Sequence, residues 1–217
     1  MIKLLLPLTV CCCAAAPAAA DLLLTEVFYD YVGVDDTYEW VEILNTGDAP
    51  VDLTGYIVAW GGTDYGYGTV VLQGQVEACG VFVVGGPGST AGNGNPVFDQ
   101  AVDLNPDIQN GGTPTDPTGA DAVALFAPGA NVLADVPLDA VIYGGTNPSG
   151  LIDETGQVGA PDVEDAPNGS TVARTSAAGS WSIREVPGPN SVDFSYVCGG
   201  TVPTRDGSWG TLKSSYR

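Results

Sequence analysis

Short apolar runs separated by glycine and proline constrain this chain most strongly. The 217 residues include 30 glycines and 16 prolines, and no long stretch shows the 3.6-residue period of an amphipathic helix. The runs are rich in valine, isoleucine and aromatic residues, which is typical of β-strands. They cover residues 22–30, 38–45, 56–60, 69–73, 80–86, 121–128, 139–145, 170–176 and 181–185. This pattern predicts an all-β sandwich.

Two segments depart from the strand pattern. Residues 87–120 are dense in glycine, proline, asparagine and aspartate, and we expect a long loop there with one short element at residues 97–104. Loops of this length inside compact domains are uncommon and often functional. The composition changes again from residue 186, so we place the sandwich domain at residues 21–190 and a C-terminal tail at 191–217.

The first twenty residues, MIKLLLPLTVCCCAAAPAAA, have the layout of an export signal. Lys3 supplies a positive start, an apolar stretch follows, and three alanines precede the expected cleavage between Ala20 and Asp21. The stretch is short and contains two prolines, whereas a membrane-spanning helix needs about 20 mostly apolar residues. We therefore expect a secreted protein, either extracellular or periplasmic.

The five cysteines fall into two groups. Cys11, Cys12 and Cys13 lie in the leader, where lipidation of one of them is the alternative to simple cleavage and the route to a membrane anchor. Cys79 and Cys198 remain after cleavage. In an oxidising compartment two remaining cysteines most simply form one disulfide, which would tether the tail to the sandwich. Two free thiols are the alternative.

Charge and composition exclude several classes of function. The net charge is −20, and removing residues 1–20 takes away one lysine and no acid, which leaves −21. Such a field repels phosphate backbones, so we expect no nucleic-acid partner, and it attracts cations. The absence of histidine excludes a Ser-His-Asp triad, a Cys-His pair and a histidine-ligated metal site. Enzymatic function survives as a mechanism that uses a carboxylate pair.

Two glutamates stand in the strand-like run YEWVEILN at residues 38–45. Alternation places Glu39 and Glu42 on opposite faces, so they cannot form a catalytic pair with each other. Each shares its face with two large apolar residues. Burial of an unpaired carboxylate is costly, so we expect one of them at a rim or beside a cation. Arg174 and Arg184 are the candidate cations.

Calcium is the small ligand that the composition favours. It takes six to eight oxygen ligands, often from loops, and residues 31–36, 102–112 and 161–169 are rich in such oxygens. The candidate ligands are Asp35, Asp36, Asp162, Glu164 and Asp165. None of these stretches follows the twelve-residue EF-hand pattern, and solvated turns are the alternative. We expect no other cofactor.

Aromatic residues give a second candidate binding feature. Tyr65 and Tyr67 follow Trp60 in a glycine-rich, hairpin-like turn. Exposed tyrosine on a short loop is typical of recognition surfaces, and stacking on a sugar or contact with a protein could both use it. The alternative is that these rings cover the edge of the sandwich.

An ordered set of motifs extends over residues 22–190. They are LLLTEVFYD, EWVEILNTGDAPVDLTGYIVAW, VFVVGG, DAVALFAPGANVLADVPLDAVIYGG and STVARTS followed by WSIREVPGPN. In this order they resemble the lamin tail domain, an immunoglobulin-like β-sandwich of nuclear lamins that also occurs in many exported bacterial proteins. The long glycine-, proline- and asparagine-rich loop after Gly86 and the tail beyond Asn190 depart from the family pattern.

The resemblance implies an interaction module and not an enzyme. In lamins the domain contacts protein partners and chromatin, but the charge of −21 opposes a chromatin contact here. We therefore expect a non-catalytic binding module at or outside the cell surface, with a protein or polysaccharide partner. The alternatives are a calcium-stabilised structural or matrix protein and a carboxylate-dependent carbohydrate hydrolase.

Overall fold

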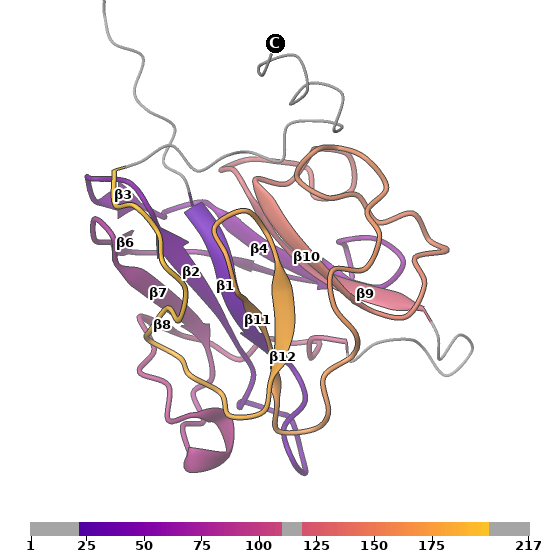
Figure 1. Cartoon of the computed structure of the whole chain (residues 1–217), viewed down its shortest axis with the longest axis horizontal. Helices are drawn as coiled ribbons and strands as arrows, with labels where there is room; N and C mark the ends of the chain where they lie inside the picture. Colours follow the sequence, from indigo (N-terminus) through magenta and orange to yellow (C-terminus); the bar gives the residue numbers. More distant parts are fainter. Residues whose placement is uncertain (1–21, 110–118, 200–217) are drawn as a thin grey trace, which may run out of the picture.

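The β-rich runs of the sequence form strands that pair into two facing sheets (Figure 1). The structure is a computed structural model, and it describes residues 22–109 and 119–199. The strands are β1 (Leu22–Phe28), β2 (Trp40–Asn45), β3 (Val51–Asp52), β4 (Ile57–Gly61), β5 (Gly68–Val71), β6 (Gln75–Val76), β7 (Val81–Gly85), β8 (Gln100–Ala101), β9 (Ala120–Phe126), β10 (Asp139–Gly144), β11 (Thr171–Arg174) and β12 (Trp181–Arg184). One short 3₁₀ helix, η1 (Ala91–Asn93), lies in the long loop.

The two main sheets are unequal. One has six strands in the order β12-β11-β1-β2-β7-β8, and the other has four in the order β10-β9-β4-β5. Strands β3 and β6 form a separate two-stranded ribbon. The named strand pairs are antiparallel except β7–β8, which is parallel. The predicted all-β sandwich with long loops is confirmed.

Differences from the predicted strands are confined to the shortest elements. The element expected within residues 97–104 is β8, which contributes two residues to the edge of the six-stranded sheet. The ribbon of β3 and β6 was not predicted, because two residues per strand are too few to show alternation. Residues 185–199 contain no helix or strand and form a C-terminal segment that continues from β12.

The main core lies between the two sheets and includes Tyr29, Trp60 and Tyr143. Apolar residues also lie on the outer faces. On the four-stranded sheet an alanine-rich layer packs under Tyr65 and Leu151, and on the six-stranded sheet Trp40 packs with its neighbours under the long loop. As a result, every residue of β1, β2 and β9 is buried.

Helices contribute almost nothing to the fold. Across residues 22–109 and 119–199, no helix has the length and apolarity needed to span a membrane.

Candidate functional site

Two glutamates face each other on the outer side of the six-stranded sheet. Glu26 on β1 is the register partner of Glu42 on β2. The register shifts between Leu24 and Glu26, and a shift of this kind inserts one extra residue into a strand. Leu24 and Val27 therefore both belong to the inner core although they are three residues apart, and Glu26 is free to lie on the outer side.

Glu26 is held by three groups from other parts of the chain. The hydroxyl of Thr171 donates to its Oε1 at 2.6 Å, and the main-chain N–H of Gly188 donates to the same oxygen at 3.0 Å. Arg184 donates from Nη1 to Oε2 at 3.1 Å. Burial raises the pKa of Glu26, and the hydrogen bonds and the arginine act against that rise.

Glu42 is fully buried, with 0 % of its surface exposed, and none of the ion pairs within residues 22–109 and 119–199 involves it. The hydroxyl of Thr25 donates to Oε1 at 2.7 Å, and the main-chain N–H of Ser191 donates to Oε2 at 3.2 Å. Burial is the main reason that the pKa of Glu42 is raised to about 7, and the charge of Glu26 adds to the rise. This carboxyl therefore changes its protonation state near neutral pH.

A cavity of about 230 Å³ adjoins this pair. Its walls come from β1, β2, β11 and β12 and from residues 191–194 of the C-terminal segment. In Figure 1 that segment runs as a yellow trace from the end of β12 toward the β3 end of the sandwich. The site thus consists of two buried carboxylates with the C-terminal segment fastened across them.

The expected pairing of an arginine with Glu39 or Glu42 is wrong. Arg184 binds Glu26 and also Asp193, the latter at 2.7 Å. Glu26 lies 158 residues from Arg184 in the sequence, so local alternation carries no signal for this pair.

Arg174 on β11 binds a different acid, Asp139 at the start of β10, and thereby joins the two sheets. Its Nη2 donates to Oδ1 of Asp139 at 2.6 Å, and both side chains are buried. The main chain of Leu24 completes the arrangement, since its N–H donates to Asp139 at 2.7 Å and its carbonyl accepts from Nε of Arg174 at 2.7 Å. The guanidinium also lies 4.8 Å from the centre of the Trp181 ring.

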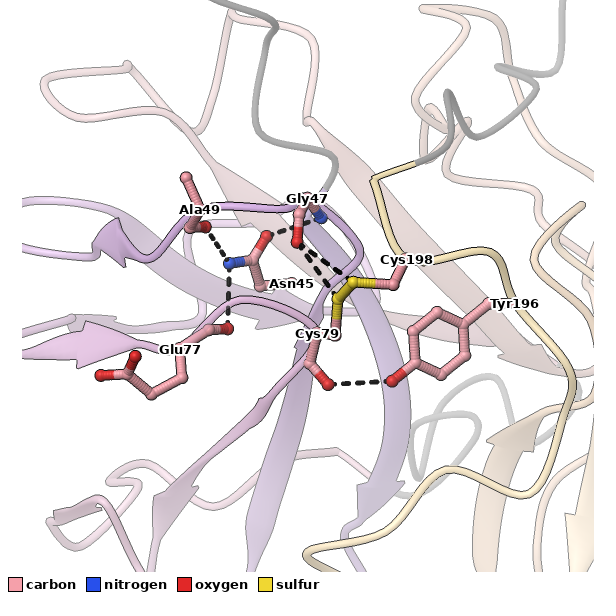
Figure 2. The surroundings of a disulfide bond; sticks show 7 residues. All are labelled: Asn45, Gly47, Ala49, Glu77, Cys79, Tyr196 and Cys198. Carbon is pink, nitrogen blue, oxygen red and sulfur yellow. Dashed lines mark hydrogen bonds between the residues drawn. A yellow bond between two sulfur atoms is a disulfide. The ribbon is translucent and has the colours of Figure 1, made fainter.

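The predicted disulfide between Cys79 and Cys198 is confirmed (Figure 2). The two Cα atoms are 5.5 Å apart, and the bridge fixes the C-terminal segment to the loop that precedes β7. The hydroxyl of Tyr196 donates to the carbonyl of Cys79 at 2.9 Å, and the N–H of Gly199 donates to the carbonyl of Thr46 at 2.7 Å. The tail is therefore tethered as far as residue 199.

Glu39 lies at the opposite end of the sandwich, directly before β2. It is buried, with 2 % of its surface exposed, which makes the expected rim position wrong. Its Oε2 accepts the N–H of Ile108 at 2.7 Å, whereas Oε1 has no hydrogen-bond partner in the described part of the chain. Burial above all raises the pKa of Glu39 to about 10, and the charges of Asp107, Asp35 and Asp103 add to the effect.

The five predicted calcium ligands lie on two separate loops. The loop between β1 and β2 carries a half-buried Asp35 and an exposed Asp36. The loop between β10 and β11 carries Asp162, Glu164 and Asp165, of which the last two are exposed.

Two of the acids on the β10–β11 loop form hydrogen bonds with residues of the sandwich. Asp162 accepts the N–H of Ile142 at 3.1 Å, and Asp165 accepts the hydroxyl of Tyr29 at 2.8 Å. In the portion of the chain that the structure describes, no three acids or cysteines are arranged to hold a metal ion. Calcium binding by Asp162, Glu164 and Asp165 stays a prediction.

The predicted aromatic binding surface needs correction because two of its three residues are in the core. Trp60 is 0 % exposed and Tyr65 is 3 % exposed, whereas Tyr67 is 51 % exposed. Trp60 donates from Nε1 to the carbonyl of Pro106 at 2.9 Å, and Tyr65 donates to the carbonyl of Ile152 at 2.7 Å. The Trp60 ring lies where a Cβ of residue 68 would be, so glycine at this position makes its burial possible. Only Tyr67 stays a candidate contact residue.

Comparison with known proteins adds a family. The sequence model of the lamin tail domain matches residues 15–144, more than half of the 217 residues. No curated protein and no solved structure matches the chain. Strands β11 and β12 lie beyond the matched residues and still belong to the six-stranded sheet. With its immunoglobulin-like β-sandwich and the family match, this chain belongs to the lamin tail domain family, whose domains are non-enzymatic interaction modules.

Proposed function

We propose that this chain is a non-catalytic interaction module that acts at or outside the cell surface, where it binds a protein or a polysaccharide. The observation that carries the proposal is that the two carboxylates on the outer face are already bound by other groups of the chain. All four oxygens of Glu26 and Glu42 accept hydrogen bonds from the chain itself. Carboxylates occupied in this way are engaged within the domain and leave recognition to its surface.

Action outside the cytoplasm is supported by two independent features. Residues 1–20 have the layout of an export signal, and Cys79 pairs with Cys198 in a disulfide, which persists in oxidising compartments. The charge of −21 after cleavage disfavours polyanionic partners. A neutral or basic protein surface, or a neutral polysaccharide, fits this charge.

Sedimentation with isolated envelopes of the producing cells tests the proposal. We expect labelled residues 21–217 to be retained saturably and to be displaced by unlabelled chain. The same preparation, reduced and alkylated, serves as a control for the folded state. Mass spectrometry of the native chain should give an N-terminus at Asp21 and no free thiol at Cys79 or Cys198. Unsaturable retention, or an intracellular chain with residues 1–20 attached, would contradict the proposal.

A carboxylate-dependent hydrolase is the second candidate, favoured by one observation. Glu26 and Glu42 face each other beside a cavity, and a carboxyl whose pKa is about 7 is suited to act as a general acid. Its test is product formation from a panel of polysaccharides. A product that disappears in both Glu26→Gln and Glu42→Gln would establish this candidate in place of the binding module, and we expect no product.

A further inference from the structure

The end of the sandwich where β2 begins carries an unbalanced group of acids. Glu39 and Asp35 come from the β1–β2 connection, and Asp103 and Asp107 come from the loop after β8. These carboxylates act on one another, since the pKa of Glu39 is raised by the other three in addition to burial. The ion pairs within residues 22–109 and 119–199 use Arg174 and Arg184, and none of them involves these acids.

A hydrogen bond attaches Glu39 to the second of these two loops. Its Oε2 is held by the N–H of Ile108, the residue after Asp107, so the carboxylate is directed at the loop of residues 103–109. Its Oε1 is buried and has no hydrogen-bond partner among residues 22–109 and 119–199. Buried polar atoms are nearly always paired, so an orphan carboxylate oxygen amid other acids calls for a ligand.

Asp35 supplies a second oxygen of the same kind. Its Oδ1 is also buried and without a hydrogen-bond partner in the described chain. A turn fixes the segment that joins the two acids, because the N–H of Tyr38 donates to the carbonyl of Asp35 at 3.0 Å. On the other side of Glu39, the N–H of Gly86 donates to the carbonyl of Glu39 at 2.9 Å. A Cβ at residue 85 would collide with that same carbonyl, so glycine allows β7 to approach this closely.

We propose that Glu39 and Asp35 bind a divalent cation of the calcium class at this end of the sandwich. Calcium accepts carboxylates together with main-chain carbonyls, side-chain amides and water, and it tolerates irregular geometry. Two carboxylates with free oxygens are fewer than an all-carboxylate cage needs, so main-chain carbonyls and water make up the remaining ligands. Asp103 and Asp107 add negative potential. The sequence has no histidine, and Cys79 and Cys198 are joined to each other in the disulfide, which disfavours zinc and copper.

The proposal is independent of the interaction function and has its own test. Purified residues 21–217 are melted in chelator and in millimolar calcium, and terbium emission sensitised by the nearby aromatic residues reports binding directly. We expect calcium to raise the melting temperature by several degrees with one ion bound per chain. Glu39→Gln and Asp35→Asn should each weaken the affinity at least tenfold.

The matched control is Glu164→Gln, an exposed acid on the other predicted calcium loop, which should keep the affinity of the unchanged chain. Glu39→Gln retains the shape of the side chain and removes its charge, so the melting temperature of this variant in chelator should not fall. If it does fall, the affinity of Asp35→Asn for calcium tests the site in its place. The proposal is overturned if calcium leaves the melting temperature and terbium emission unchanged. It is also overturned if both variants bind as tightly as the control, or if magnesium at the same concentration gives the full effect.

Discussion

At the scale of single residues, the buried acidic side chains of this protein differ in their hydrogen-bond and ion-pair partners. Within the part of the chain that the structure describes, Glu26 and Asp139 each bind an arginine, Glu42 accepts from a hydroxyl and the main chain, and Glu39 accepts from the N–H of Ile108. A buried carboxylate without a cation favours its neutral form, because removal of its charge from water is costly. The stability of the fold should therefore depend on pH in a way that individual substitutions can assign.

Glu42→Gln tests this dependence. The pKa of Glu42 is raised from 4.5 to about 7, so its neutral form stabilises the fold fully below pH 4.5, and that contribution is lost as the pH rises to about 7. We expect the unchanged chain to lose about 3 kcal/mol more than Glu42→Gln over this interval, at 1.36 kcal/mol per pKa unit. Urea unfolding at pH 4.5 and 8 in chelator measures it. Glu185→Gln, at an exposed acid directly after β12, is the control. Identical pH profiles for Glu42→Gln and the unchanged chain would contradict the assignment.

Arg174→Met tests the buried ion pair that joins the sheets. The substitution leaves Asp139 buried and without its cation, which typically costs about 3–5 kcal/mol of the free energy of unfolding. Adding Asp139→Asn removes the stranded charge and should recover part of that loss. Chemical denaturation of both variants gives the values. A loss under about 1 kcal/mol for Arg174→Met would show that the pair contributes little.

At the scale of elements, the C-terminal segment after β12 completes the outer face of the larger sheet. The main-chain N–H groups of Gly188 and Ser191 reach the two outer glutamates, and the side chain of Asn190 exchanges hydrogen bonds with the main chain of Val97 at 2.8 Å. The disulfide then fixes the segment near residue 198. The segment is thus attached at several points along its length.

Removal of the disulfide tests whether these attachments act independently of one another. The bridge spans 119 residues, and a loop of that length corresponds to about 4–5 kcal/mol on the chain-entropy account. We expect Cys79→Ser with Cys198→Ser to lose stability of that order and to speed amide exchange most at residues 192–199. Exchange at Gly188 should change less, because its bond to Glu26 is retained. A uniform change along the whole chain would contradict independent attachment.

At the scale of the whole molecule, the sandwich extends past the residues that the family model matches. That match ends at residue 144, yet β11 pairs with β1, and β12 pairs with β11. A chain ending at residue 144 would expose the edge of β1 and leave Asp139 without Arg174. We expect residues 21–144 to lack a cooperative melting transition and residues 21–199 to melt as the full chain does. Cooperative unfolding of the shorter chain, measured by calorimetry, would contradict this.

The sequence was sufficient for the strands, the sandwich and the disulfide, because alternation, turn residues and cysteine count are local or compositional signals. The sequence was insufficient where contacts between distant segments determine burial and ion-pair partners. Trp60 and Tyr65 were predicted as surface aromatics, but both rings are buried and hydrogen-bonded to the carbonyls of Pro106 and Ile152. Glu42 became buried because the C-terminal segment lies over it, and the arginine partners were set by competition between distant acids. None of these contacts leaves a periodic trace in its own strand.

Isothermal titration calorimetry tests the central claim, that this domain binds without transforming, most directly. Purified residues 21–217 are titrated into the solubilised polysaccharide and protein fractions of the producing cell's envelope, with Glu42→Gln run in parallel. We expect one fraction to give heats that saturate and return to baseline for both chains. Sustained thermal power that scales with the amount of protein and is lost in Glu42→Gln would reveal turnover and contradict the claim, as would the absence of saturable heat from every fraction.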